Sequence, residues 1–236
     1  MTCKNALRTD HEFDSLGSHP FGKVPLMTKT PLLDRGDPEE KREEIRQYFH
    51  NTFSLYESLF ECLEGDDAFY TRANPLRHPL IFYYGHTSVF FINKLNVARL
   101  IDQRVDPKLE SMVAIGVDEM SWDDLNEAHY DWPTPAQIKA HRNQTRAIVD
   151  KFIRRCEVTL PITWESPLWV VMMGIEHERI HLETSAVLIR ELPIEKVRSH
   201  HMWGKIARRG NTAPQNELLP VAGGSVSLGK TRDNPL

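Results

Sequence analysis

Four long segments of the chain repeat apolar residues every three or four positions, and this pattern constrains the fold more than any other feature. The segments begin near Asp37, Pro79, Thr134 and Ser166. Such spacing puts the apolar side chains on one side of an α-helix, so each segment predicts a helix with a buried stripe. Four helices of this length, with one long connection between two of them, are typical of a four-helix bundle. We therefore expect an all-α protein.

The expected helices have clear start and stop signals. Asp37 and Pro38 suit the first turn of a helix, because Asp caps free backbone amides and proline fits the first helical position. Thr134 and Gln137 form a capping box at the start of the third helix, and Pro193 stops the fourth. The expected ranges are 37–65, 79–101, 134–153 and 166–192.

The residues within each segment indicate how deeply the helix lies. The segment 79–101 is apolar around most of its circumference, so we expect it deep in the domain. The segment 134–153 has a mixed stripe, which predicts the side that faces the core. The members of this stripe are Ile138, His141, Thr145, Ile148, Phe152 and Ile153.

Three further regions lack helical periodicity. Residues 1–36 are expected to form an extended arm, either flexible or wrapped on the domain surface, since prolines and glycines interrupt it. The connection 102–133 is long for a compact domain, and we expect short helical turns within it at 107–114 and 122–127. The acidic residues of the loop 116–126 could position substrate amines, but we favour simple packing of this loop onto the bundle. The stretch 219–230 alternates around a Gly-Gly turn, which predicts a short strand-like tail.

Composition excludes several classes of function. The net charge is -4 and the basic residues do not cluster, which argues against a nucleic-acid-binding protein. No apolar run approaches the roughly 20 residues that a membrane span needs. The three cysteines, Cys3, Cys62 and Cys156, are far apart, so neither a disulfide framework nor a thiolate zinc site is expected. With no apolar leader at the N-terminus, we expect a cytoplasmic protein.

The strongest chemical signal is a pair of histidines in the fourth helix. His177 and His181 are four residues apart, so their side chains lie on the same face and can bind one metal ion. The pair follows the apolar run 168–175, which should be buried. Placing imidazoles next to such a run is costly unless a partner satisfies them. A metal ion would be such a partner, and two hydrogen-bonded core histidines are the alternative.

A third ligand has to come from another helix, and His86 is the best candidate. It lies in the most apolar helix, one turn before Phe90, where a buried histidine is otherwise hard to explain. His78 stands at the start of that helix and is expected at the surface or in a cap. His129 and His141 are weaker candidates. Three neutral imidazoles leave coordination positions open, which suits Zn(II) or Fe(II) and argues against calcium or magnesium.

Two carboxylates accompany the histidine pair. Glu183 lies roughly 200° around the helix from His181, so it should not reach the same ion. Glu178 has a similar difficulty, although the string HERIH formally fits the HExxH motif of zinc peptidases. The chain shows neither the downstream third ligand nor the substrate-binding edge strand that such enzymes need. We therefore keep a zinc peptidase only as a minor alternative.

Longer strings carry a resemblance to a known family. The segments HPLIFYYGHTSVFFINKL (78–95), GVDEMSWDDLN (116–126), HYDWP (129–133) and MGIEHERIHLETSAVLIRELP (173–193) resemble the ovothiol-type 5-histidylcysteine sulfoxide synthases. The resemblance extends over about residues 15–236 and rests on several segments in the same order. It implies a DinB-like iron-binding bundle over residues 37–200. Residues 201–236 would then be a linker and the first strand of a formylglycine-generating-enzyme-type domain.

The resemblance also implies a cofactor and a reaction. Fe(II) would be held by His86, His177 and His181, and dioxygen would couple cysteine to the imidazole of histidine as a sulfoxide in ovothiol biosynthesis. In this family a catalytic tyrosine comes from the second domain, of which we expect this chain to contain only the start, so we assign no catalytic residue. We expect this chain alone to bind iron but to be weak or inactive as a synthase.

Two other functions remain open on the sequence. One is a DinB-type thiol transferase that uses zinc or nickel to activate a small thiol. The other is a non-catalytic bundle whose metal site is structural or vestigial. Iron with oxygen-dependent turnover would favour the synthase, and zinc with oxygen-independent thiol transfer would favour the transferase.

Overall fold

The described part of the computed structural model is helical and consists of residues 29–114, 130–203 and 215–229. No strand occurs within these ranges, so the expected all-α class is confirmed. The elements are α1 (Pro38–Phe60), the short 3-10 helix η1 (Asp66–Phe69), α2 (Leu80–Val97), α3 (Pro107–Ala114), α4 (Pro135–Arg155), α5 (Pro167–Glu191) and the 3-10 helix η4 (Ile194–Lys196).

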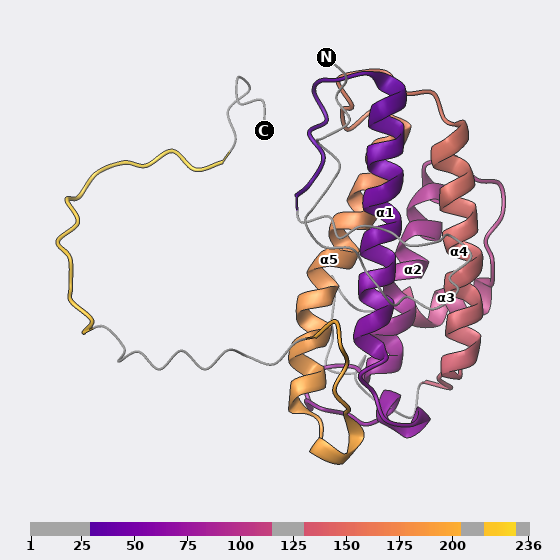
Figure 1. The fold of residues 1–236 in the computed structure, drawn as a ribbon, viewed down its shortest axis with the longest axis vertical. Coiled ribbons are helices and arrows are strands. Elements are labelled where there is room, and N and C mark those ends of the chain that lie inside the picture. Colours follow the sequence, from indigo (N-terminus) through magenta and orange to yellow (C-terminus); the bar gives the residue numbers. More distant parts are fainter. Residues whose placement is uncertain (1–28, 115–129, 204–214, 230–236) are drawn as a thin grey trace.

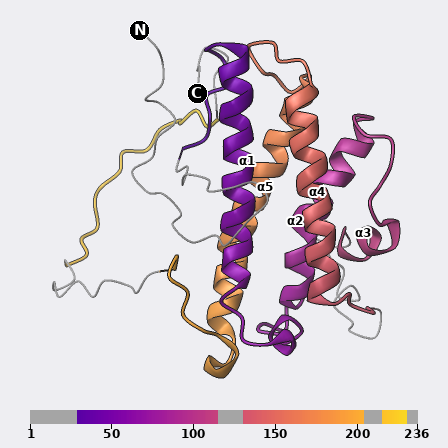
Figure 2. The same ribbon diagram turned by 45° about the vertical axis from the view of Figure 1, so that its right-hand side comes forward.

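The four long helices pack as a bundle in which α1 and α2 lie at opposite corners (Figure 1). Each of these two helices packs against both α4 and α5. The short helix α3 packs on the outside of α2, as the turned view also shows (Figure 2). Because α2 packs against α3, α4, α5 and η1, its position agrees with the prediction of a deeply placed, apolar helix.

The predicted caps are present at the helix starts. The Asp37 side chain accepts hydrogen bonds from the backbone amides of Glu39 (2.9 Å) and Glu40 (3.1 Å) at the start of α1. Thr134 accepts from the Gln137 amide at 3.2 Å, and the Gln137 side chain accepts in return from the Thr134 amide at 2.8 Å. These bonds satisfy amides that the first turn of a helix leaves free.

The helix α2 is shorter than predicted, because a left-handed residue ends it. The sequence indicated a helix up to Ile101, whereas the structure ends it at Val97. Arg99 has a φ of 57°, and the Leu100 amide donates to the Leu95 carbonyl at 2.9 Å. This six-to-one bond is characteristic of a helix C-terminus that turns away from the axis.

The helix α1 also ends early, at Phe60 rather than near Gly65. The chain beyond it pairs with a distant segment, and Leu63 forms an isolated antiparallel bridge with Val197. The amides of residues 64 and 198 donate to the carbonyls of residues 196 and 62, each at 2.8 Å. The residues after α1 therefore use their backbone groups to hold the chain that follows α5.

Two apolar clusters fill the two ends of the bundle. One cluster includes Tyr56, Phe60, Leu80, Tyr84, Ile138 and Leu188, and the other includes Ile45, Phe53, Phe91, Val149, Val171 and Ile175. Between them every long helix contributes buried polar side chains. This polar layer comprises Ser54 of α1, His86, Thr87 and Ser88 of α2, His141, Arg142, Thr145 and Arg146 of α4, and Glu178, His181 and Ser185 of α5.

The predicted stripe of α4 is only partly right. Four of its members are buried, namely Ile138, His141, Thr145 and Ile153, whereas Ile148 and Phe152 are only half-buried. Arg142, Arg146, Val149 and Asp150 are buried instead. The helix is thus rotated about its axis relative to the prediction, because buried acidic partners allow the two arginines to face inward.

The end of the N-terminal arm lies against the bundle. The Leu33 carbonyl accepts from the Ile162 amide at 2.7 Å. The Thr30 hydroxyl donates to Glu176 at 3.3 Å and lies 3.2 Å from the hydroxyl of Tyr48. For residues 29–36, wrapping on the domain surface is therefore the alternative that holds, and residues 1–28 lie outside the described part.

Two remaining predictions concern segments outside the bundle. The helical turn expected at 122–127 lies outside the described residues. The strand expected at 219–230 is not formed within residues 215–229, which are exposed and have no strand hydrogen bonds. A strand needs a neighbour for its backbone groups, and no described residue pairs with this segment.

None of the described helices is both long and apolar enough to span a lipid bilayer.

Candidate metal centre

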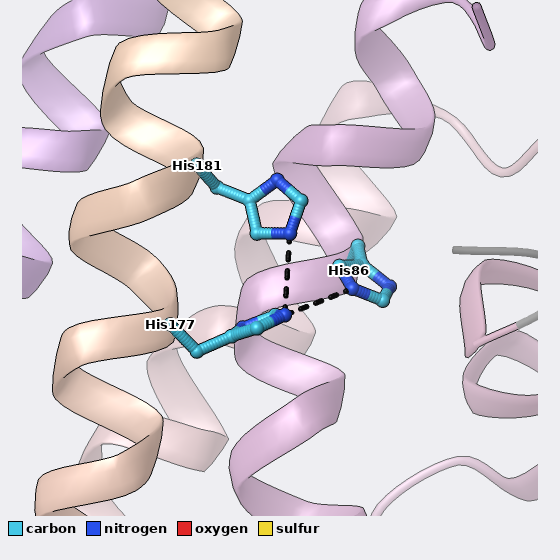
Figure 3. Close-up of side chains that lie close together, drawn as sticks. All are labelled: His86, His177 and His181. Atoms are coloured by element: carbon cyan, nitrogen blue, oxygen red, sulfur yellow. Dashed lines mark hydrogen bonds between the residues drawn. The ribbon is translucent and has the colours of Figure 1, made fainter. Parts of the chain in front are cut away.

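Three histidine side chains from α2 and α5 meet at one point in the polar layer (Figure 3). His177 and His181 are one turn apart on α5, and His86 faces them from α2. The Nε2 atom of His177 lies 3.3 Å from Nε2 of His86 and 3.2 Å from Nε2 of His181. Among the described residues this is the only group whose potential ligand atoms lie close enough to bind one metal ion. The structure therefore brings together the three residues that the sequence singled out.

Hydrogen bonding orients the ring nitrogens of this group. His86 Nδ1 lies 2.7 Å from the Val113 carbonyl, to which it can only donate, so the Nε2 lone pair of His86 faces the other two rings. In the described part of the chain, the buried Nδ1 atoms of His177 and His181 have no hydrogen-bond partner. A metal ion bound between the three converging Nε2 atoms would satisfy nitrogens that otherwise face one another in a buried site.

The electrostatic environment keeps these rings neutral. Burial, reinforced by the neighbouring histidines, lowers the pKa of His177 to about 2. Burial and His86 lower the pKa of His181 to about 4. A metal binds the unprotonated nitrogen, so both rings are ready to act as ligands at neutral pH.

Aromatic rings support the histidines from the side. Phe90 stacks on His177 with ring centroids 3.8 Å apart and planes 11° from parallel. Phe82 stacks on His86 at 5.0 Å. These contacts restrict the rotation of the imidazoles, as a preorganised ligand set requires.

The carboxylates of the HExxH string do not belong to this group. Glu178 is fully buried, and its Oε1 accepts hydrogen bonds from Arg142 at 2.8 Å and from Thr87 at 3.1 Å. Glu183 is exposed on the outside of α5. A zinc peptidase needs this glutamate as a base beside the metal-bound water. The position of Glu178 in the ion-pair network therefore excludes the peptidase alternative.

The other candidate ligands lie elsewhere. His141 is buried, and its ring nitrogens lie 3.1 Å from Ser88 and 3.3 Å from Glu110. His78 is 4% exposed and packs against the rings of Phe82 and Trp132, so its expected surface position was wrong. An apolar pocket of aromatic rings accounts for this burial. His129 lies outside the described residues.

Comparison with protein families agrees with this architecture. The model of the DinB superfamily matches residues 48–185, which is more than half of the chain. The chain belongs to the DinB superfamily. No curated protein matches the chain. The matched range contains all three histidines, so the candidate metal centre lies inside the DinB domain.

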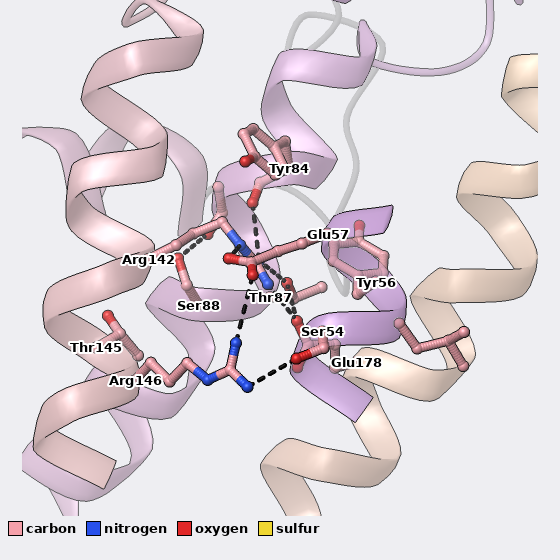
Figure 4. A network of polar contacts seen from close by, with 12 residues as sticks. Ser54, Tyr56, Glu57, Tyr84, Thr87, Ser88, Arg142, Thr145, Arg146 and Glu178 are labelled. Carbon is pink, nitrogen blue, oxygen red and sulfur yellow. Dashed lines mark hydrogen bonds and ion pairs between the residues drawn. The ribbon is translucent and has the colours of Figure 1, made fainter. Parts of the chain in front are cut away.

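Sequence reasoning missed two buried arginines of this DinB domain. Arg142 and Arg146 are each 0% exposed, although both come from a helix whose predicted stripe excluded them. They contact Glu57 of α1 and, through Arg142, Glu178 of α5 (Figure 4). Their spacing of four residues, in line with Ile138, was the only sign of an inward position.

Ion pairing keeps these buried groups charged. The carboxylates of Glu178 and Glu57 hold the pKa of Arg142 above its ordinary value in spite of burial. Burial lowers the pKa of Arg146 to about 10, so it too is protonated at neutral pH. Both arginines behind the histidines are therefore positively charged, whereas burial keeps His177 and His181 neutral.

Proposed function

We propose that this DinB domain holds Fe(II) and belongs to an oxygen-dependent sulfoxide synthase that joins cysteine to the imidazole ring of histidine. In the net reaction the thiol and a ring C–H each lose a hydrogen and a C–S bond forms. One oxygen atom of dioxygen becomes the sulfoxide oxygen, and the other leaves as water. The four electrons that the two substrates lose are those that dioxygen accepts.

The observation that carries the proposal is the composition of the donor set. Three neutral nitrogens, from His86, His177 and His181, converge without a carboxylate among them. Such a set leaves the full charge of a divalent ion in place and leaves coordination positions open, which favours an anionic ligand such as a thiolate. When bound there, iron(II) would supply the electron transfer between thiol and dioxygen that the side chains lack.

Longer sequence segments indicate a specific group of enzymes that contain a DinB domain. The segments 78–95 and 173–193, which contain all three histidines, resemble the ovothiol-type synthases. The match to the DinB superfamily supports only the wider family, and the assignment to the ovothiol-type synthases rests on the resemblance. Cysteine, histidine and dioxygen are accordingly proposed as the substrates.

Residues of this chain would orient the metal and attract the substrate. The Val113 carbonyl holds the His86 ring, and Phe90 covers one face of His177. Lys94 is exposed on the same side of α2, with its Nζ 5.1 Å from the centre of the Phe90 ring. Its positive charge adds to that of a bound ion, and would draw the carboxylate and thiolate groups of an amino acid toward the site.

Metal analysis and turnover together test the proposal. The protein is purified without oxygen, loaded with Fe(II) and mixed with cysteine, and the Mössbauer spectrum is compared with that of the protein alone. Under the proposal iron binds in a one-to-one ratio and cysteine changes its spectrum. Admission of dioxygen with histidine then yields the coupled sulfoxide, detected by mass spectrometry, when the domain acts within its complete enzyme.

Two results would contradict the proposal. One is a preference for zinc together with thiol transfer that proceeds without oxygen, as expected for a thiol transferase. The other is an iron spectrum that cysteine leaves unchanged, as expected for a structural metal site.

A further inference from the structure

We propose that Arg142 is a positioning residue, which sets the register of α2 against α5 so that their histidines meet. This inference rests on the metal site in the proposed function, but not on the sulfoxide reaction. It concerns the charged network that lies behind the three histidines rather than the histidines themselves.

Arg142 closes a ring of hydrogen bonds with one residue of α2 and one residue of α5, the two helices that carry the three histidines of the metal group (Figure 4). Its Nη1 donates to the Thr87 hydroxyl at 2.9 Å, and its Nη2 donates to Glu178 Oε1 at 2.8 Å. The Thr87 hydroxyl donates to the same carboxylate oxygen at 3.1 Å. The ring therefore joins α2, α4 and α5 at one level of the bundle.

The two partners of Arg142 are the sequence neighbours of two histidines. Thr87 follows His86, and Glu178 follows His177. Consecutive residues of a helix point about 100° apart, so the ring and the histidine group occupy different sides of the same contact between helices. A slip of α5 by one residue would move His177 by about 1.5 Å along the axis and turn it away. The same slip would break the ring.

The burial of Arg142 argues against a role in packing alone. Its side chain is 0% exposed, and it also donates to the Tyr84 carbonyl at 3.1 Å and to Glu57 at 3.2 Å. Apolar residues of similar volume usually stabilise a core as well as a buried ion pair does. Directional bonds, in contrast, define a single register, which is the best attested use of buried polar groups. A metal site needs that single register.

Arg146 provides a matched control on the same helix. It lies one turn further along α4 and is also 0% exposed. Its hydrogen bonds to His50 Nδ1 (3.0 Å) and to the Ser54 hydroxyl (2.7 Å), and its ion pair with Glu57 (3.5 Å), lead to α1, which carries none of the three histidines. Loss of Arg146 should therefore disturb the core without moving the two helices that carry the ligands.

The test compares Arg142→Met with Arg146→Met in the whole chain, with Co(II) as the probe ion. We expect both variants to lower the melting temperature of the metal-free protein by about 10 °C. Only Arg142→Met should weaken Co(II) binding, by about 10- to 100-fold, and change the visible absorption spectrum of bound Co(II). Equal losses of affinity in both variants, or an Arg142→Met variant with unchanged affinity and spectrum, would overturn the proposal.

A double variant separates positioning from stability. Arg142→Met combined with Glu178→Met replaces the ion pair with apolar side chains and should recover most of the melting temperature. Under the proposal it does not recover Co(II) affinity, whereas a merely structural role predicts that both recover together. If Arg142→Met does not fold, Thr87→Val removes one bond of the ring at nearly constant shape, and should weaken Co(II) binding several-fold. Because cobalt binding needs neither iron nor oxygen, failure of the sulfoxide reaction leaves this test intact.

Discussion

The Nδ1 atom of His86 lies 2.7 Å from the carbonyl oxygen of Val113, so the short helix α3 determines which nitrogen of His86 faces the other histidines. The position of α3 is itself held by Glu110, which is 0% exposed. Glu110 accepts from the backbone amides of Val105 (2.8 Å) and Asp106 (2.9 Å) and lies 3.3 Å from His141 Nε2. His141, a buried histidine outside the metal group, thus supports the helix that orients His86.

Replacing His86 by Ala should abolish tight metal binding. Removal of one of three ligands leaves only the pair on α5. We expect Zn(II) affinity to fall by at least about 100-fold, since even loss of a residue that hydrogen-bonds to a metal ligand lowers metal affinity by about 10- to 100-fold. Isothermal titration measures this loss. The matched control is His50→Gln, at a buried histidine of α1 away from the metal group, which should keep the one-to-one stoichiometry. An unchanged metal content in His86→Ala would show that the third ligand lies elsewhere.

Replacing Glu178 by Ala should destabilise the fold, because it leaves the buried Arg142 guanidinium without its main partner. Breaking a buried pair in this way lowers the free energy of unfolding by about 3–5 kcal/mol. Glu183→Ala changes the same residue type on the exposed side of α5 and should stay within about 0.5 kcal/mol of the parent. Urea unfolding of the metal-free proteins measures both. Similar values for the two variants would contradict a buried ion pair at Glu178.

Local rules and helical spacing predicted much of this structure. The caps at Asp37 and Thr134, the short helix 107–114 and the convergence of His177 with His86 were all visible in the order of residues. These features depend on neighbours within a few positions, or on the simple fact that a buried imidazole needs a partner. The all-α class followed from the same patterns, whereas the DinB family followed from the resemblance of longer sequence strings.

The features that were missed depend on contacts between distant segments. Arg142 and Arg146 face inward only because Glu57 and Glu178, from two other helices, neutralise them. The early end of α1 depends on Val197, which bridges Leu63 from beyond α5. None of these three partners can be inferred from local spacing, because the positions of the helices must be known first.

Two glycines at close helix contacts should respond differently to alanine. A Cβ atom at Gly174 would overlap ring carbons of Phe91, a side chain that is 1% exposed and cannot move aside. Overpacking costs about 1–3 kcal/mol, which outweighs the gain of about 1 kcal/mol from replacing a helical glycine. At Gly85 the Cβ would lie 2.7 Å from Cδ1 of Ile138, the far end of a flexible side chain, and 3.3 Å from Cγ1 of Val113.

We therefore expect Gly174→Ala to lower the free energy of unfolding by about 1–2 kcal/mol. Gly85→Ala should be close to neutral, since the helix propensity gained offsets the small rearrangement of Ile138. Thermal unfolding of the two variants side by side provides the measurement. A Gly174→Ala protein at least as stable as Gly85→Ala would show that α2 and α5 are less tightly packed than the structure indicates.

Acid should weaken the fold through His50, a buried residue of α1 away from the metal group. Its Nδ1 accepts from Arg146 at 3.0 Å, so the proton lies on Nε2, which is 2.8 Å from Asp150. Burial lowers the pKa of His50 to about 4 from its ordinary 6.5, and the charges of Arg146 and Arg46 act in the same direction, while the hydrogen bond to Asp150 opposes them only in part. Protonation would place a third positive charge beside these two arginines and remove the acceptor that Arg146 uses.

The sign of the effect follows from the direction of this pKa shift. Between pH 6.5 and 4 the unfolded chain binds a proton at His50 that the folded chain does not, so stability is complete above pH 6.5 and is lost as the pH falls toward 4.

We compare urea unfolding of the parent with that of His50→Gln, whose amide can still donate to Asp150 but does not titrate. The histidines of the metal group titrate in both proteins, so the difference between the two profiles isolates His50. The parent should lose up to about 1.4 kcal/mol per pH unit more than the variant below pH 6. Parallel profiles would mean that His50 is not held neutral in the core.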